Sequence, residues 1–256
     1  MLIATPISRL FNDSESAERI ISASDCLECR DWCINSEYPK QHLFHFDLNI
    51  IHEWNNEQKQ LIKSVTKFKK ELKLISFHLS SCYMNPVIIE DMFQPNGKLY
   101  SRQEMILNAK NNIAWLKGFL NKDINIAVEN TNYYPTPAYK YITEGNFIEQ
   151  VVIENKINFL FDISHAMITA HNIKTDYRKY RGTLPIASTV QLHVSNFKIN
   201  EDGIAVDKHD LPDESIYNEV KEIIKCNPVK YLTVEFYEET AGLLETIQKY
   251  RSVNLS

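Results

Sequence analysis

Glycine is scarce in this chain, with six residues among 256. Loops that wrap a phosphate group depend on glycine, and neither the GxGxxG pattern nor the GxxxxGK[ST] pattern occurs. The usual dinucleotide-binding and P-loop sites are therefore excluded, and any chemistry must depend on something other than a bound nucleotide.

Long apolar runs, an excess of positive charge and an even set of cysteines are also missing. No apolar run approaches the length of a membrane span, and the opening segment LIATPISRLFND turns polar too soon for a secretory signal. Five cysteines fit reduced thiols better than a disulfide framework. The net charge of -5 argues against a surface built to attract nucleic acid. We therefore expect a cytoplasmic protein without a membrane or nucleic-acid partner.

Short apolar runs alternate along the chain with longer amphipathic stretches. Helical spacing of apolar residues is clear in EQKQLIKSVTKFKKEL and in SRQEMILNAKNNIAWLKGFL. Seven strands are predicted, in LIATPIS, HLFHFDLNI, LKLISFHL, INIAVEN, INFLFDIS, TVQLHVS and KYLTVEFY. This alternation implies parallel strands with right-handed crossovers. We therefore expect an α/β fold, a single (β/α)8 barrel of TIM type over residues 1–256, with one strand irregular or missing.

The segment CLECRDWC and two long stretches between predicted strands and helices remain to be assigned. The spacing of Cys26, Cys29 and Cys33 places them on one helical face, so we expect a helix that buries three thiols in the core. The segments 85–100 and 133–146 read as long loops after strands. Such loops are expected to lie over the active face of the barrel.

Ionisable residues stand at the ends of nearly all the predicted strands. A single residue of this kind more often hydrogen-bonds a loop, but a strand buried on both faces tolerates it only with a partner or a function. The strand ends of a barrel converge at one rim, so the recurrence predicts a shared site. These residues are His45, His78, Glu129, Asp162, His165, His193 and Glu235.

The chemistry of this set indicates metal binding. Neutral imidazoles and carboxylates are ligands that suit zinc, iron or manganese. Asp162 with His165, and Asp207 with His209, each offer a carboxylate and an imidazole close together. Neighbouring metal ions need bridging carboxylates, and Glu129 is suitably placed, as is the glutamate of the last strand. The sequence therefore predicts two or three metal ions at the rim.

The order of these motifs resembles a known family. FHLSS, VENTNYY, FDISHA, LHVSNF followed by DKHDLPDE, and VEFYEE occur in sequence across most of the chain. Together they resemble the multinuclear non-heme iron-dependent oxidative enzymes. That resemblance implies a barrel related to xylose isomerase and to the type-four apurinic endonucleases. It also implies oxidation of ribosomally made precursor peptides, often at cysteine.

The resemblance implies three metal positions, with Glu129 shared between the first two. In order, their ligands would be His45, His78 and Glu129; Asp162, His193 and Glu235; and His165, Asp207 and His209. His42 and His52 lie in the same region as His45 and stay open as the first ligand. Catalytic roles are expected for Glu129, Asp162, His165 and Asp207.

The implied cofactor is a group of two or three iron ions with O2 as co-substrate, although the same ligand types accept zinc and manganese. The implied partners are a precursor peptide and, by analogy, a separate protein that presents the leader of that peptide.

Two other activities fit the same residue types. Three zinc ions would activate water for phosphodiester cleavage at abasic DNA, and Arg178, Lys179 and Arg181 form one local basic cluster. A sugar isomerase or epimerase with one divalent metal would leave several of the histidines idle. Its ligands would be Glu129, Asp162, His193 and Glu235. A binding module without catalysis would leave all these side chains unexplained.

Overall fold

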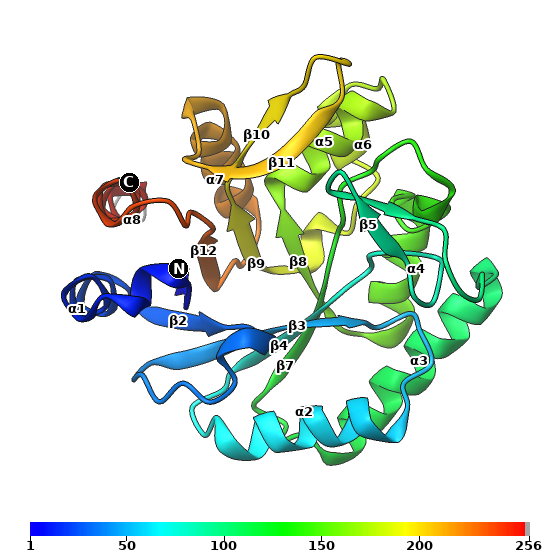
Figure 1. Ribbon diagram of the computed structural model, residues 1–256, viewed down its shortest axis with the longest axis horizontal. Helices are drawn as coiled ribbons and strands as arrows, with labels where there is room; N and C mark the ends of the chain where they lie inside the picture. The colour runs from blue at the N-terminus through cyan, green and yellow to red at the C-terminus, as the bar shows by residue number, and fades with distance from the viewer. Residues whose placement is uncertain (254–256) are drawn as a thin grey trace.

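A closed barrel of eight parallel strands forms the centre of the computed structural model, which describes residues 1–253 (Figure 1). Around the barrel the strands follow the order β1-β12-β9-β8-β7-β4-β3-β2, so β1 closes the ring between β2 and β12. The predicted α/β barrel is confirmed. The strands are β1 (Leu2–Pro6), β2 (Cys26–Cys29), β3 (Gln41–Asn49), β4 (Leu74–His78), β7 (Asn125–Glu129), β8 (Asn158–Asp162), β9 (Thr189–Val194) and β12 (Tyr231–Val234).

The eighth strand is β2, and it lies where a helix was predicted. Cys26 and Cys29 belong to this strand, and Cys33 ends a short 3-10 helix, η2 (Asp31–Cys33). The prediction of one helical face was therefore wrong, although all three thiols are buried as expected. Backbone pairing with β1 and with β3 decides the outcome, because a four-residue segment carries little periodic signal of its own.

Helices coat the outside of the barrel (Figure 1). Capping boxes fix the starts of the two helices that the spacing predicts, through Asn55 with Gln58 and through Ser101 with Glu104. The helices are α1 (Ser14–Ala23), α2 (Asn56–Phe68), α3 (Arg102–Phe119), α4 (Gly145–Asn155), α5 (Ile163–Asn172), α6 (Tyr177–Arg181), α7 (Glu214–Cys226) and α8 (Thr240–Val253). The 3-10 helices besides η2 are η1 (Arg9–Asn12), η3 (Pro137–Tyr139) and η4 (Ile186–Ser188).

No helix in the described part of the chain has the length and apolar character needed to cross a membrane.

One apolar layer fills the interior of the barrel, with one residue from each strand. Its members are Ala4, Cys26, Leu43, Leu74, Ala127, Leu160, Val190 and Tyr231. Side chains alternate along a strand, so the residue two positions further on also points inward. In β2, β3, β7 and β8 that residue is polar and buried, namely Glu28, His45, Glu129 and Asp162. The polar site therefore lies directly above the apolar layer, towards the carboxyl ends of the strands.

Two hairpins stand beside the carboxyl ends of the strands. After β4, the predicted loop contains β5 (Val87–Ile89) and β6 (Met92–Gln94), and after β9 the chain forms β10 (Asn196–Ile199) and β11 (Ala205–Asp210). Figure 1 shows β5 and the β10–β11 hairpin on the same side of the barrel. An ion pair of 3.3 Å between Lys208 and Asp91 joins the two hairpins.

The buried side chain of Asn130, just after Glu129, joins β7 to β8 beside the polar site. Its amide donates to the carbonyl of Asp162 (2.9 Å) and accepts from the backbone N–H of the same residue (2.9 Å). Asn130→Ala leaves both backbone groups without these partners, so we expect the free energy of unfolding to fall by about 1–3 kcal/mol. Urea denaturation of the chelator-treated chain measures this change.

Asn111→Ala, at an exposed position on α3, is the matched control and should change the free energy of unfolding by less than about 0.5 kcal/mol. Equal destabilisation by the two substitutions would contradict a clamp between β7 and β8.

Candidate metal centre

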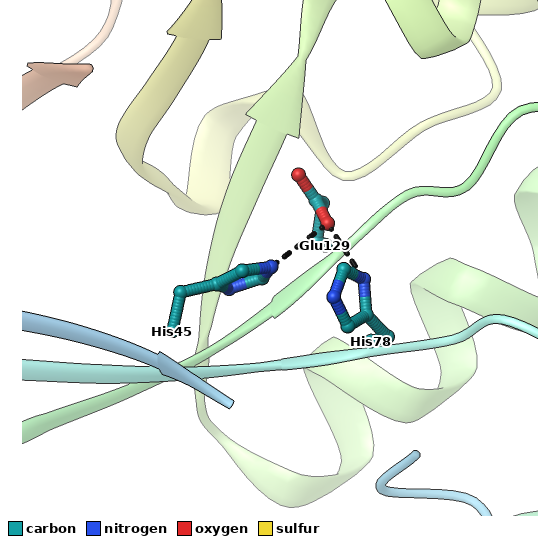
Figure 2. Close-up of side chains that lie close together, drawn as sticks. All are labelled: His45, His78 and Glu129. Atoms are coloured by element: carbon teal, nitrogen blue, oxygen red, sulfur yellow. Dashed lines mark ion pairs between the residues drawn. The ribbon is translucent and has the colours of Figure 1, made fainter. Parts of the chain in front are cut away.

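Glu129, at the end of β7, faces histidines on two sides. One oxygen, Oε2, lies 3.3 Å from His45 Nε2 and 2.9 Å from His78 Nδ1, and both rings point at this carboxylate in Figure 2. The other oxygen, Oε1, lies 3.0 Å from Nδ1 of His193. A single carboxylate therefore separates two groups of possible ligands, and each group receives one of its oxygens.

The second group lies across β7, β8, β9 and β12. Asp162 and His193 join Glu129 in a set whose ligand atoms all lie within 4.8 Å of one another. Glu235, just after β12, places Oε1 3.4 Å from His193 Nδ1. The three carboxylates are almost fully buried, so this part of the rim carries much negative charge in little space.

The third group combines α5 with the β10–β11 hairpin. His165 Nε2 lies 3.8 Å from Asp162 Oδ2 and 3.3 Å from Asp207 Oδ2. His209 Nε2 lies 3.5 Å from Asp207 Oδ2 and 3.7 Å from Glu235 Oε2. This group thus touches the second one through both Asp162 and Glu235, and the structure brings all nine predicted residues to one rim.

The backbone of His209 supports this arrangement. Its φ of 47° is left-handed, a conformation in which histidine is more frequent than most residues. Its N–H donates to Asp207 Oδ1 over 3.1 Å, which turns both side chains towards the barrel. Local strain of this kind persists where the surrounding structure holds it, and functional sites are common places for it.

Other polar groups orient the histidine rings. His45 Nδ1 lies 2.7 Å from the hydroxyl of Ser76, and His165 Nδ1 donates to the carbonyl of Asn130 over 2.9 Å. In each ring one nitrogen is thereby occupied, and Nε2 is left facing the site. Histidine ligands of metal ions are typically held in this way by a second partner.

Glu28 on β2 orients the ring of His193. The sequence pattern did not predict this residue as part of the site. Its Oε2 accepts from His193 Nε2 over 3.0 Å, which leaves Nδ1 towards Glu129. Arg30 in turn donates to Glu28 Oε1 (2.7 Å) and to Glu235. In β2, Glu28 lies two residues after Cys26 of the apolar layer, just as Glu129 in β7 lies two residues after Ala127. A prediction of CLEC as a strand would therefore have identified Glu28.

Four buried atoms at the rim have no hydrogen-bond partner among residues 1–253. They are His45 Nε2, Glu129 Oε2, Asp162 Oδ2 and His193 Nδ1. Unpaired buried polar atoms are costly, and each of these atoms is a good ligand for a divalent cation. Metal coordination would satisfy all four, so the residues present fit a metal centre.

Burial would lower the pKa of His165 and of His193, but neighbouring carboxylates hold both values well above their usual range, so a metal ion would have to displace a proton from each ring. Burial raises the pKa of Asp162 to about 7, and the negative charges of Glu129 and Glu235 add to the increase. Burial lowers the pKa of His45 to about 4, so this imidazole is neutral near pH 7 and able to bind a metal. For Glu28, burial would raise the pKa, but the charges of His193 and Arg30 hold it far below its usual range.

The structure also distinguishes between the three candidate first ligands. His45 is in the cluster with His78 and Glu129. Nε2 of His52 instead lies 2.8 Å from the carbonyl of Ser81, and its ring stacks on another aromatic ring. His42 lies at the start of β3, away from the rim.

Two of the nine rim residues are much more exposed than the others. The side chains of His78 and His209 are 23% and 37% exposed, whereas those of Glu129, His193 and Glu235 are at most 3% exposed. A molecule that reaches the rim would therefore meet these two histidines first.

If the rim binds divalent cations, metal will stabilise the fold. Zinc or ferrous iron at about 100 times the dissociation constant should add about 2.7 kcal/mol to the free energy of unfolding of the chelator-treated chain. Glu129→Gln should remove most of this gain, because it replaces the shared carboxylate. Exposed Glu149 on α4 provides the control Glu149→Gln. Equal gains in the two variants would rule out Glu129 as a ligand.

Comparison with known proteins agrees with the barrel and shows the family. A model of the family described as "RiPP precursor modification enzyme MbnB/TglH/ChrH" matches residues 46–249, which include every predicted ligand except His45. UPF0276 proteins of Bordetella pertussis and Bordetella parapertussis are each 26% identical over 98 residues, 36% of this chain. The match spans only about a third of those relatives, 34% of their length.

Solved structures share the fold. A 3-keto-D-glucoside 4-epimerase from E. coli superimposes with a TM-score of 0.60 at 13% identity over 100% of both chains. A D-psicose 3-epimerase gives a TM-score of 0.60 at 14% identity over 98% of this chain and 90% of the other. These likenesses establish the TIM-type barrel, whereas the family match extends over most of the sequence and includes the rim residues. The chain belongs to the MbnB/TglH/ChrH family of RiPP precursor modification enzymes.

Proposed function

We propose that the chain oxidises a cysteine-containing precursor peptide with O2 at a centre of two or three iron ions. The main support is the third group, His165, Asp207 and His209, which stands beside the first two and shares contacts with Asp162 and Glu235. A single-metal epimerase would not require these three side chains. Membership of a peptide-modifying family supports the choice of substrate.

In this proposal each group of residues has a defined role. Glu129 would contribute one oxygen to each of the first two metal positions, and its negative charge would offset the repulsion between two cations. Asp162 and Glu235 would contribute to the second position and also lie close to the residues of the third. Iron, when bound, would supply electrons to O2 and a Lewis acid for the substrate thiol.

Residues of the chain itself would orient the substrate at the rim. His78 and His209 are the more exposed rim residues, so a cysteine side chain from an extended peptide would reach the rim beside them. The hydroxyl of Tyr134 accepts from the N–H of Asp207 (3.2 Å), and the ring of Tyr237 lies 5.2 Å from that of His209. These two tyrosines hold the hairpin residues in place while a substrate binds.

The proposal also includes a separate protein that presents the leader of the peptide, and a location in the cytoplasm. The first rests on analogy within the family and the second on the composition of the chain.

Element analysis combined with three activity assays tests this function. After anaerobic purification with iron, we expect about two or more equivalents of iron per chain and O2 uptake that depends on a cysteine-containing peptide. The same peptide with serine in place of cysteine is the control. Stoichiometric zinc with cleavage of abasic DNA would instead indicate a nuclease. One divalent ion with sugar epimerisation would indicate an epimerase.

The third metal position can be tested separately. Asp207→Ala combined with His209→Ala should lower bound metal by about one equivalent while the circular dichroism spectrum stays unchanged. Lys208→Ala, between them on the same strand and exposed, should leave the metal content as it is. Unchanged metal content in the double variant would contradict a third position.

Glu28 should act as a positioning residue for His193. Glu28→Gln keeps the size of the side chain but removes the charge that holds His193 Nε2, so we expect metal affinity to fall about 10- to 100-fold. Competition with a chromophoric chelator measures this affinity. The exposed Glu15 on α1 supplies the control Glu15→Gln, and equal affinities would argue against the role of Glu28.

A further inference from the structure

A second cluster of reactive groups lies outside the barrel, between β2, β3, η2 and the end of α2. The thiol of Cys29 donates to Gln41 Oε1 over 2.7 Å, and Lys69 Nζ donates to the same oxygen over 2.5 Å. Lys69 Nζ also reaches the hydroxyl of Ser36 at 3.1 Å. The thiols of Cys29 and Cys33 lie close enough to influence each other's pKa. Two thiols and an ammonium group thus share one buried environment.

Lys69 is buried without a close carboxylate. Its exposure is 4%, and among residues 1–253 no carboxylate oxygen lies within 4.0 Å of its ammonium group. The carboxylate of Glu37 acts on it only from further away. Neutral oxygens of Ser36 and Gln41 accept hydrogen bonds from this ammonium group, and the acidic groups beside it are the thiols of Cys29 and Cys33. The arrangement therefore favours a thiolate.

Cys33 is the better placed of the two thiols to carry that charge. The backbone N–H of Arg30 donates to Cys33 Sγ over 3.0 Å. The neighbouring Cys29 thiol, this backbone hydrogen bond and the positive charge of Lys69 together lower the pKa of Cys33, against the effect of burial. Cysteines in such an electropositive setting are the reactive ones.

Small molecules can reach this thiol. Cys33 lines a surface cavity of about 610 Å³, together with Asp31 and Trp32. A second cavity of about 810 Å³ is lined by Gln41 and Lys69. Because Cys33 faces the first cavity, a small oxidant in solution would meet it before Cys29, which is fully buried.

We propose that Cys33 and Cys29 form a redox-active thiol pair that hydrogen peroxide converts to an intramolecular disulfide. The Cys33 thiolate attacks one peroxide oxygen and the O–O bond breaks, which gives a sulfenic acid and, after protonation, water. The Cys29 thiol then attacks that sulfur, and the hydroxyl leaves as a second water. In total the two thiols lose two electrons and two protons, and one peroxide becomes two waters.

The other cysteines lack this setting. Burial raises the pKa of Cys26 to about 12, and it also raises the pKa of Cys82. Cys226 is exposed on α7, and serves as an internal reference for an ordinary surface thiol. Oxidation of the thiol pair requires neither bound metal nor precursor peptide. A negative result for the disulfide would therefore leave the proposed peptide oxidation untouched, and the reverse also holds.

Mass spectrometry of the full-length chain tests the thiol pair. The protein is purified in zinc-containing, iron-free buffer so that no iron consumes the oxidant, and is treated with hydrogen peroxide and then with a thiol-blocking reagent. We expect a Cys29–Cys33 disulfide, reversible with dithiothreitol, that forms about tenfold faster than Cys226 is modified. Peroxide that modifies Cys226 first, or that leaves Cys29 and Cys33 as thiols, would overturn the proposal.

Variants separate the two thiol roles. Cys29→Ser should leave Cys33 as a sulfenic acid that dimedone traps, whereas Cys33→Ser should leave Cys29 unmodified. Cys226→Ser is the matched control and should form the disulfide as the wild type does. Trapping of Cys29 in the Cys33→Ser variant would contradict the assigned roles.

The pH dependence of Cys33 alkylation tests whether Lys69 stabilises the thiolate. Lys69→Met removes the ammonium group but keeps a flexible apolar stem, so the pH at which Cys33 reacts half-maximally with iodoacetamide should rise by about one unit or more. Lys67→Met at the neighbouring end of α2 is the control. An unchanged pH profile would show that Lys69 does not stabilise the thiolate, whether or not the disulfide forms.

Discussion

The buried carboxylate of Glu129 faces His45 and His78 with one oxygen and His193 with the other. Burial of a carboxylate is costly unless positive charge or hydrogen-bond donors surround it. Here the surrounding imidazoles come from three strands, and two of their nitrogens lack hydrogen-bond partners within residues 1–253. The rim is thus a site that bound cations would stabilise further, and Glu129 lies between the two groups of side chains that would hold them.

The strands bring the imidazoles and carboxylates of the rim together but do not orient their side chains. Surrounding polar groups orient the imidazole rings: Ser76 and Glu28 each hydrogen-bond to the ring nitrogen that faces away from the site. Glu28 holds His193 and Arg30 links Glu28 to Glu235, so β2 and the residue after it help to position two ligand-bearing strands although they supply no predicted ligand. The same short segment carries Cys29 and Cys33 on either side of Arg30, which brings the thiol pair close in sequence to the rim.

The barrel does not by itself distinguish this chain from sugar epimerases of the same shape. In this chain the β10–β11 hairpin carries Asp207 and His209 over the rim beside His165. Loops at the carboxyl ends of barrel strands commonly change the chemistry of a shared scaffold in this way. Here a local turn, with His209 in a left-handed conformation, extends the set of possible ligands.

The sequence alone determined the barrel and most of the rim. Strands and helices alternate clearly, and a histidine or carboxylate in a buried strand is conspicuous, so seven strands and nine rim residues could be predicted. Only the tertiary structure decided that CLEC is the eighth strand, that Glu28 and Arg30 support the rim, and that His45 rather than a neighbouring histidine faces Glu129. The reason is physical: a strand of four residues carries too little periodicity to be recognised, and Glu28 meets His193 across 165 positions of chain.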